Sequence, residues 1–393
     1  MQALGLGWRR WVCGLTAVGA AWLSAVVVQA AEPVQNTVAA GLAAEQRGDL
    51  PGAIAILRPL AEAGDKAAEY NLGRYYNQGL GVPADAATAA MWYRKAVDQG
   101  DAYAKGDLGV LYLQGRGVPR DAAKGAALLE AAADAGVGVA QANLCIVYGQ
   151  GLGIAKDIPK AIASCRKAAV QGVAAAQFMM GGLSMASAPG VVKDNRAAFA
   201  WYFAAAARGY APAQNQLGLC FLNGWGVAAD PAAAVGWWRE SAAQNEAHAQ
   251  FNLGEAYAKG LGVGADLAQS MAWFQKAADQ NLPGAQVRLA AAYETGVGEK
   301  KDLAQAFDWW RRAAEHGDAI AQIKLGLDYA AGTGVARDSV SGLTWLEIGI
   351  GRQPPAPPTI LGIATATRAT LIAHMSPAEI DKAEAAAKAW KPR

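Results

Sequence analysis

A large apolar residue followed by a small one recurs along most of the chain at a nearly constant spacing. Successive pairs lie 36 residues apart, except for one interval of 37. A fixed period of this length indicates a repeat architecture, so the sequence predicts eight units in register. We call the apolar residue of each pair the anchor and count offsets from it. The pairs are Leu72-Gly73, Leu108-Gly109, Leu144-Cys145, Met180-Gly181, Leu217-Gly218, Leu253-Gly254, Leu289-Ala290 and Leu325-Gly326.

An aspartate follows each anchor at offset 13, or at offset 14 in the fourth unit, which carries one inserted residue. An aspartate before an alanine-rich stretch is typical of a helix N-cap and contributes about 1 kcal/mol. The glycines before it, as in "GLGVPAD" from Gly79, supply the positive φ that ends a helix. Each unit is therefore predicted to hold helix A, a glycine-rich turn, helix B and a second turn. The predicted caps are Asp85, Asp121, Asp157, Asp194, Asp230, Asp266, Asp302 and Asp338.

Aromatic residues stand at offsets 20 and 21 of helix B in most units, with small residues three or four positions away. Small residues let two helices approach while the aromatic rings fill the space to the next pair, so no unit buries its apolar face alone. The sequence predicts an all-α protein in which stacking of the units is obligatory. The aromatic pairs are Trp92-Tyr93, Trp201-Tyr202, Trp237-Trp238, Trp273-Phe274 and Trp309-Trp310.

The combined pattern, A-x-x-x-L-G-x-x-Y-x-x-G-x-G-V-x-x-D-x-x-x-A-x-x-W-x-x-K-A-A-x-x-G, resembles the Sel-one-like repeat (SLR) family, a relative of the tetratricopeptide repeat. "AAEYNLGRYYNQGLGVPADAATAAMWYRKAVDQG" from Ala67 matches it closely. The resemblance implies a right-handed α/α superhelix, a solenoid, that serves as a scaffold or adaptor. It covers residues 67–351 as eight units. Residues 37–66 resemble a short opening unit, 352–358 form a Pro-rich spacer, and 359–393 are expected to form C-terminal capping helices.

The first 30 residues have the features of a signal peptide. Arg9 and Arg10 precede an apolar run, and Val28-Gln29-Ala30 has small residues where a signal peptidase cleaves. We expect cleavage near Ala30 and a periplasmic or secreted protein, with an uncleaved anchor as the alternative. No later segment is apolar for long enough to span a membrane, and the net charge of +2 gives no basic field for nucleic acid.

Two cysteines of the third unit replace residues that other units conserve by type. Cys145 stands in the small position after the anchor, and Cys165 stands at offset 21, which is aromatic elsewhere. Both fall on facing helices, so we expect either a disulfide between them or two buried free thiols. Cys220 is expected to remain free.

The sequence holds little that predicts catalysis. The glycine-rich turns lack the Gly-Lys-Ser/Thr of a P-loop, and Ser164 to Lys167 matches S-x-x-K without the S-D-N or K-T-G elements of penicillin-recognising enzymes. Because cysteine-rich members of the resembled family have been linked to penicillin binding, a protein that binds peptidoglycan or β-lactams remains the alternative. His248, His316 and His374 have no ligand spacing, so we expect no metal and no cofactor.

By analogy with tetratricopeptide geometry, helix A lines the concave face of the superhelix. Its residues there are mostly apolar in the central units and polar at the ends. They are expected either to form a groove for a protein or peptide, or to pack against adjacent helices. We thus expect a monomeric, exported, non-catalytic adaptor of the bacterial cell envelope, acting in signalling, surface assembly or host interaction. The predicted residues are Tyr70, Arg74, Asn77, Gln78, Val110, Leu113, Gln114, Ile146, Gln150, Phe178, Met185, Leu219, Leu222 and Asn223.

Overall fold

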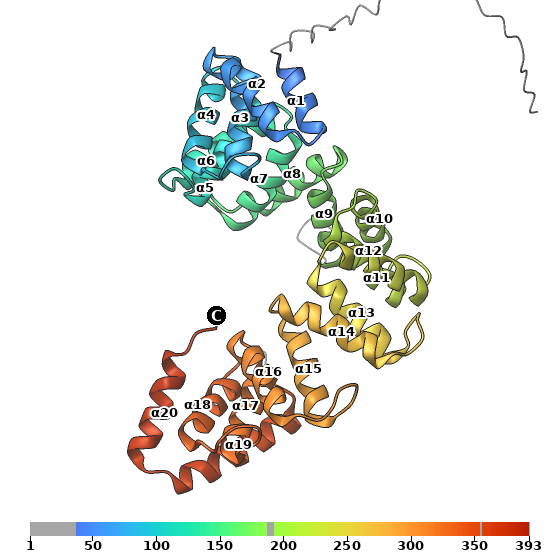
Figure 1. The fold of residues 1–393 in the computed structure, drawn as a ribbon, viewed down its shortest axis with the longest axis vertical. Helices are drawn as coiled ribbons and strands as arrows, with labels where there is room; N and C mark the ends of the chain where they lie inside the picture. The colour runs from blue at the N-terminus through green and yellow to red at the C-terminus, as the bar shows by residue number, and fades with distance from the viewer. Residues whose placement is uncertain (1–36, 187–191, 354–355, 393) are drawn as a thin grey trace, which may run out of the picture.

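The structure is a computed structural model that describes residues 37–186, 192–353 and 356–392. Their regular structure consists of twenty helices and no strand. The helices follow one another in chain order along a curved rod, with α1 and α2 at one end and α19 and α20 at the other (Figure 1). The prediction of an all-α superhelix of stacked helix pairs is confirmed. The predicted signal peptide lies outside the described residues.

Helix A of each unit carries the anchor near its middle. The first begins at Lys66, one residue before the predicted start of the repeats, because Asp65 accepts a hydrogen bond from the backbone N–H of Ala68. The eight helices A are α3 (Lys66–Gln78), α5 (Ala102–Gln114), α7 (Gly138–Gln150), α9 (Ala174–Ala186), α11 (Ala211–Asn223), α13 (Ala247–Lys259), α15 (Pro283–Thr295) and α17 (Ala319–Ala331).

Helix B begins directly after the predicted cap in every unit. The side chains of all eight aspartates accept hydrogen bonds from backbone N–H groups in the first turn, which would otherwise lack partners. The helices B are α4 (Ala86–Asp98), α6 (Ala122–Asp134), α8 (Ile158–Val170), α10 (Asn195–Ala206), α12 (Pro231–Ala243), α14 (Leu267–Asp279), α16 (Leu303–Glu315) and α18 (Ser339–Ile350).

In the seven units other than the fourth, the A–B turn contains two glycines with different structural roles. The first, such as Gly115 with φ 70°, is the left-handed C-cap of helix A. The second also has a positive φ and lies against the preceding unit: a Cβ added to Gly117 would lie 2.2 Å from the backbone of Ala86. These loops are therefore turns that pack each unit against the preceding one.

The glycine after the anchor makes room for the aromatic residue at offset 21. A Cβ added to Gly218 would lie 2.4 Å from Nε1 of Trp238, and one added to Gly254 would lie 2.5 Å from the ring of Phe274. Such distances leave no space for a methyl group, so the ring of helix B packs directly on the backbone of helix A.

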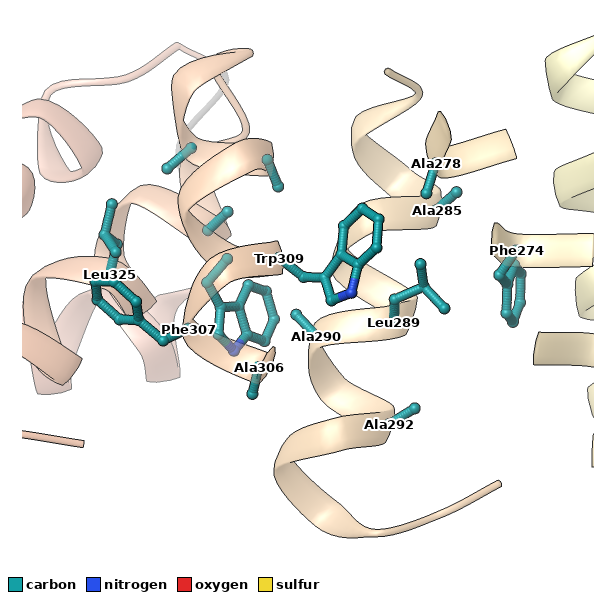
Figure 2. Close-up of a cluster of buried hydrophobic side chains, with 14 of the residues drawn as sticks. Phe274, Ala278, Ala285, Leu289, Ala290, Ala292, Ala306, Phe307, Trp309 and Leu325 are labelled. Atoms are coloured by element: carbon teal, nitrogen blue, oxygen red, sulfur yellow. The ribbon is translucent and has the colours of Figure 1, made fainter. Parts of the chain in front are cut away.

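The hydrophobic core lies between units as much as within them. One cluster of buried side chains joins four consecutive helices through Phe274 of α14, Leu289 of α15, Trp309 of α16 and Leu325 of α17 (Figure 2). Each unit thus contributes side chains to the core of its neighbour, and in a single isolated unit these apolar side chains would be exposed to water.

Additional helices cover both ends of the array. The opening pair α1 (Val38–Gln46) and α2 (Leu50–Glu62) packs Leu57 against Leu72 of the first unit. At the other end, α19 (Pro358–His374) and α20 (Pro377–Ala389) cover the buried side chains of Leu343 and Leu346. Pro358 was assigned to the spacer but lies in the first turn of α19, where its missing N–H costs no hydrogen bond. None of the described helices is long and apolar enough to cross a bilayer.

Candidate protein-binding surface

The helices A of consecutive units contact one another through polar side chains. Asn252 Nδ2 donates to Asn215 Oδ1 across 2.8 Å and joins α13 to α11. Lys324 Nζ donates to the Glu294 carboxylate across 2.8 Å and joins α17 to α15. Similar pairs are Arg288 with Glu255 and Arg74 with Glu45. These pairs join α1 to α3 at one end of the array and α11, α13, α15 and α17 at the other. We call the side of the solenoid formed by the helices A the helix-A face.

Most apolar residues predicted for this face are half-buried and pack into the core shared with the following unit. One side of each of these helices A faces solvent, and the other side packs against the next helix pair. The structure therefore favours the packing alternative for these six side chains. They are Val110 and Leu113, Phe178 and Met185, and Leu219 and Leu222.

The predicted residues of the helix-A face that are exposed are mainly polar. At offset 6, at the C-terminal end of helix A, amide side chains recur on the surface, and only Ile146, which is 43% exposed, adds a large apolar side chain from the predicted set. A row of amides can both donate to and accept from a peptide backbone. The amides are Gln78, Gln114, Gln150 and Asn223.

Two predicted residues of the first unit are already engaged within the protein. The guanidinium of Arg74 pairs with Glu45 and holds the pKa of that carboxyl below its ordinary value. Asn77 Oδ1 accepts a hydrogen bond from Arg116 Nη2 at 3.2 Å. A partner would have to displace or share these bonds.

An aromatic cluster lies beside them. The ring of Tyr70 lies 6.0 Å from that of Tyr93 and 5.9 Å from that of Tyr103, which is 60% exposed. Burial raises the pKa of Tyr70 to about 12, so its hydroxyl stays protonated at neutral pH. Burial also raises the pKa of Asp107, and the neighbouring hydroxyls of Tyr93 and Tyr70 oppose that shift. Tyr103 is the exposed ring of this cluster, whereas Tyr93 is fully buried. Asp107 was not among the predicted residues.

Cys145 of α7 and Cys165 of α8 form a disulfide whose Cα atoms lie 5.1 Å apart. In the third unit this bond takes the place of the glycine–aromatic contact that joins helices A and B elsewhere, as between Gly218 and Trp238. Cys220 is a buried free thiol, and burial raises its pKa to about 11, so the reactive thiolate is scarce at neutral pH.

Ser164 and Lys167 lie one turn apart in α8 and line the same open hollow of about 300 Å³. Residues three positions apart share a face of any helix, so this proximity follows from their spacing alone. The histidines are dispersed and bonded locally: His248 to Glu246, His316 to the Arg312 carbonyl, and His374 to that of Thr370. Within the described part of the chain, no three potential ligands are grouped to hold a metal ion.

A ladder of buried glutamines was missed at the sequence level. Gln141, three residues before its anchor, donates to the carbonyl of Ala133 in the preceding unit at 3.2 Å and accepts from Gln171 at 3.0 Å. The same position is glutamine in six units, and this recurrence was the available signal. Where the second glutamine is replaced, the buried Oε1 has no partner among the described residues. These orphaned atoms belong to Gln177, Gln286 and Gln322.

Comparison with known proteins identifies the repeat. The family model of the Sel1 repeat matches residues 66–101, 102–137, 138–173, 174–210, 211–246, 247–282, 283–318 and 319–350. A protective antigen of uropathogenic Escherichia coli strains, whose crystal structure displays an SLR fold, is 30% identical, with a TM-score of 0.68 over 90% of this chain and 76% of that one. A Sel1 repeat protein from Oxalobacter formigenes is 29% identical, with a TM-score of 0.58 over 86% of this chain and 94% of that one. No curated protein matches the chain. The chain therefore belongs to the Sel1 repeat family, whose repeats imply a scaffold for protein–protein interaction.

Proposed function

We propose that the protein is an exported, non-catalytic adaptor that binds a protein or peptide partner along its helix-A face. The observation that carries this proposal is the recurrence of exposed amide side chains at the same offset of helix A in four units, at Gln78, Gln114, Gln150 and Asn223. Polar side chains also join helix A to helix A from α1 to α3 and from α11 to α17. A long surface presented by rigid helices is what the concave side of a solenoid offers a partner.

The chemistry of the face favours an extended peptide bound through its backbone. Most predicted apolar side chains of helix A are half-buried in the cores of following units, while Gln114, Ile146 and Gln150 are exposed. Amides pair with backbone N–H and C=O groups, and one apolar side chain provides a contact for a residue of the peptide. The binding surface is therefore narrower and more polar than the predicted groove.

An envelope location is supported by two features of the chain. The disulfide between Cys145 and Cys165 persists in oxidising compartments such as the periplasm. Residues 1–30 resemble a signal peptide, with Arg9 and Arg10 before an apolar run and small residues at Val28 and Ala30. The similar protein from Escherichia coli is a protective antigen, which agrees with a role in envelope signalling, surface assembly or host interaction.

Site-specific crosslinking in the native envelope tests the proposal. A photoreactive residue placed at Gln114 or Gln150 is expected to capture the same partner, whereas one at Gln269, exposed on helix B, is not. The triple variant Gln114→Ala, Ile146→Ala and Gln150→Ala should weaken binding of that partner at least tenfold without loss of helical circular dichroism. Equal capture from Gln269, or full binding by the triple variant, would contradict the assignment.

The alternative function is a cell-wall protein that binds peptidoglycan or β-lactams. The observation in its favour is the common hollow of Ser164 and Lys167. Covalent labelling by a fluorescent penicillin that disappears in Ser164→Ala would establish it. A muropeptide pull-down tests binding without acylation.

A further inference from the structure

A cation covers an indole ring on the outer turn of helix B in three units. The indole stands at offset 20 and the cation at offset 23, one helical turn later, close enough for a cation–π interaction. Lys95 Nζ lies 4.2 Å from the ring centroid of Trp92, Lys276 Nζ lies 3.9 Å from that of Trp273, and Arg312 Cζ lies 4.5 Å from that of Trp309.

The third unit keeps the cation but lacks the ring. Lys167 stands at offset 23, and Ser164 replaces the tryptophan at offset 20. A serine side chain fills only a small part of the volume of an indole. The open hollow of about 300 Å³ lies at this place and is lined by both residues.

Two walls of the hollow correspond to residues beside an indole in another unit. In the seventh unit Trp309 lies beside Leu289, on the side towards Ala278 of the preceding helix B (Figure 2). At the corresponding offsets the third unit has Leu144 and Ala133, and both line the hollow. The space thus includes the position of the missing tryptophan, and its remaining lining includes the charged side chains of Glu130, Asp134 and Lys160.

Two features fix the walls of the hollow. The disulfide ties α7 to α8 directly beside Ser164. The hydroxyl group of Tyr148 donates a hydrogen bond to the Glu130 carboxylate across 2.6 Å and thereby joins α7 to α6. These three helices supply the lining, so the hollow is preformed and a ligand need not order it.

The rim of the hollow is open and partly apolar. A second hollow adjoins it, sharing Ala133 and Lys167, and leads to Val170, which is 74% exposed. Val170 therefore offers a ligand an apolar contact beside the hollow.

We propose that this hollow binds an aromatic side chain, tryptophan in preference to others, presented by a partner protein. The ring occupies the position of the missing indole against Leu144 and Ala133, with Lys167 over its face. This site is separate from the helix-A face and rests on the proposed function only in that the partner is a protein.

The test uses the folded, oxidised protein with indole and a Gly-Gly-Trp-Gly-Gly peptide as probes, and Gly-Gly-Ala-Gly-Gly as the control peptide. Titration followed by amide nuclear magnetic resonance should shift the signals of α6 to α8 around Ser164 and saturate for both aromatic probes. Ser164→Trp fills the hollow from within and should weaken binding at least tenfold, and Lys167→Ala should weaken it about threefold. Lys156→Ala, exposed in the turn before α8, is the matched control.

Two further variants keep the test decisive if Ser164→Trp does not fold. Ser164→Leu is the first, because Leu128 occupies the same offset in the second unit. Trp273→Ser should open a similar hollow beneath Lys276 and create indole binding there. Saturable shifts confined to other helices, or undiminished binding by a folded Ser164→Trp or Ser164→Leu protein, would overturn the proposal. Self-association abolished by these variants would instead identify a second copy of this chain as the partner. None of these results depends on the helix-A face.

Discussion

The ring that packs on the glycine after the anchor leaves no space there for a side chain. In the fifth unit Gly218 of α11 lies under Trp238 of α12, whereas Gly236 of α12 has open space where a Cβ would lie. The two positions share a helical backbone but differ in surroundings, so they separate the effect of packing from that of helix propensity.

We expect Gly218→Ala to lower the free energy of unfolding by about 1–3 kcal/mol, because the methyl group forces the ring and the helices apart. Gly236→Ala should leave stability unchanged or raise it by about 0.5–1 kcal/mol, since alanine restricts the unfolded chain more than glycine does. Urea denaturation followed by circular dichroism measures both. A neutral Gly218→Ala would show that the two helices can separate without cost.

A buried carboxyl gives the last unit a pH-dependent stability. Burial raises the pKa of Asp328 to about 6, with Lys324 opposing the shift and Glu294 adding to it. In the unfolded chain the group titrates near 3.9. Between about pH 4 and pH 6 the unfolded chain therefore loses a proton that the folded chain retains, so this group lowers stability as the pH rises and has its full effect above about 6.

The variant Asp328→Asn should not show this loss of stability at higher pH, because asparagine does not ionise. The variant's stability relative to the unmodified protein should increase by about 2 kcal/mol from pH 4 to pH 7, less than the full effect because part of it is already present at pH 4. Urea denaturation at both pH values measures it, with Asp308→Asn on the exposed side of α16 as the control. An unchanged difference between the two pH values would contradict the assignment.

Among the elements, the helices were predictable because their signals lie in consecutive residues. Gly224 ends helix A and Asp230 starts helix B by local backbone chemistry, whatever the neighbouring units do. The surroundings of Phe178 were not predictable in this way. Its turn of α9 is covered by the following helix pair, and only the angle between units decides whether its ring faces a partner or a core. The disulfide remained one of two alternatives for the same reason, since it requires α7 and α8 at a defined separation.

Covering helices are elements whose removal has a predictable effect. Deletion of residues 358–393 removes α19 and α20 and exposes Ile323, Leu343 and Leu346, all fully buried in the whole chain. We expect the truncated protein to bind a hydrophobic dye strongly and to aggregate or melt at a lower temperature, because solenoid ends need a polar cover. The control exchanges Leu371, which contacts this cluster, for serine in the full chain and should have a smaller effect in the same direction. A truncated protein that stays monomeric with an unchanged melting temperature would show that α18 needs no cover.

At the scale of the whole molecule, stability depends on the contacts between neighbouring units, so one unit can divide the array. The third unit has lost both aromatic residues of helix B and holds its two helices together through the Cys145–Cys165 bond. A crosslink between residues 20 positions apart stabilises the folded state by about 3 kcal/mol on the chain-entropy model. Without it, we expect unfolding to divide the array at the third unit, because each described helix pair packs mainly on its neighbours in the chain.

In the double variant Cys145→Ala and Cys165→Ala, the amide hydrogens of α7 and α8 should therefore exchange faster than those of α13 to α16. The variant should also unfold in two steps, whereas the oxidised protein should unfold in one. Hydrogen exchange with mass spectrometry resolves this by peptide. Cys220→Ala, which removes a buried thiol outside the third unit, controls for the loss of a cysteine as such. Equally faster hydrogen exchange in all units would mean that the units unfold together and that the disulfide does not stabilise the third unit in particular. Faster exchange confined to α7 and α8 would also predict that the hollow beside Ser164 loses its fixed shape, and indole binding by the double variant would then fall in parallel.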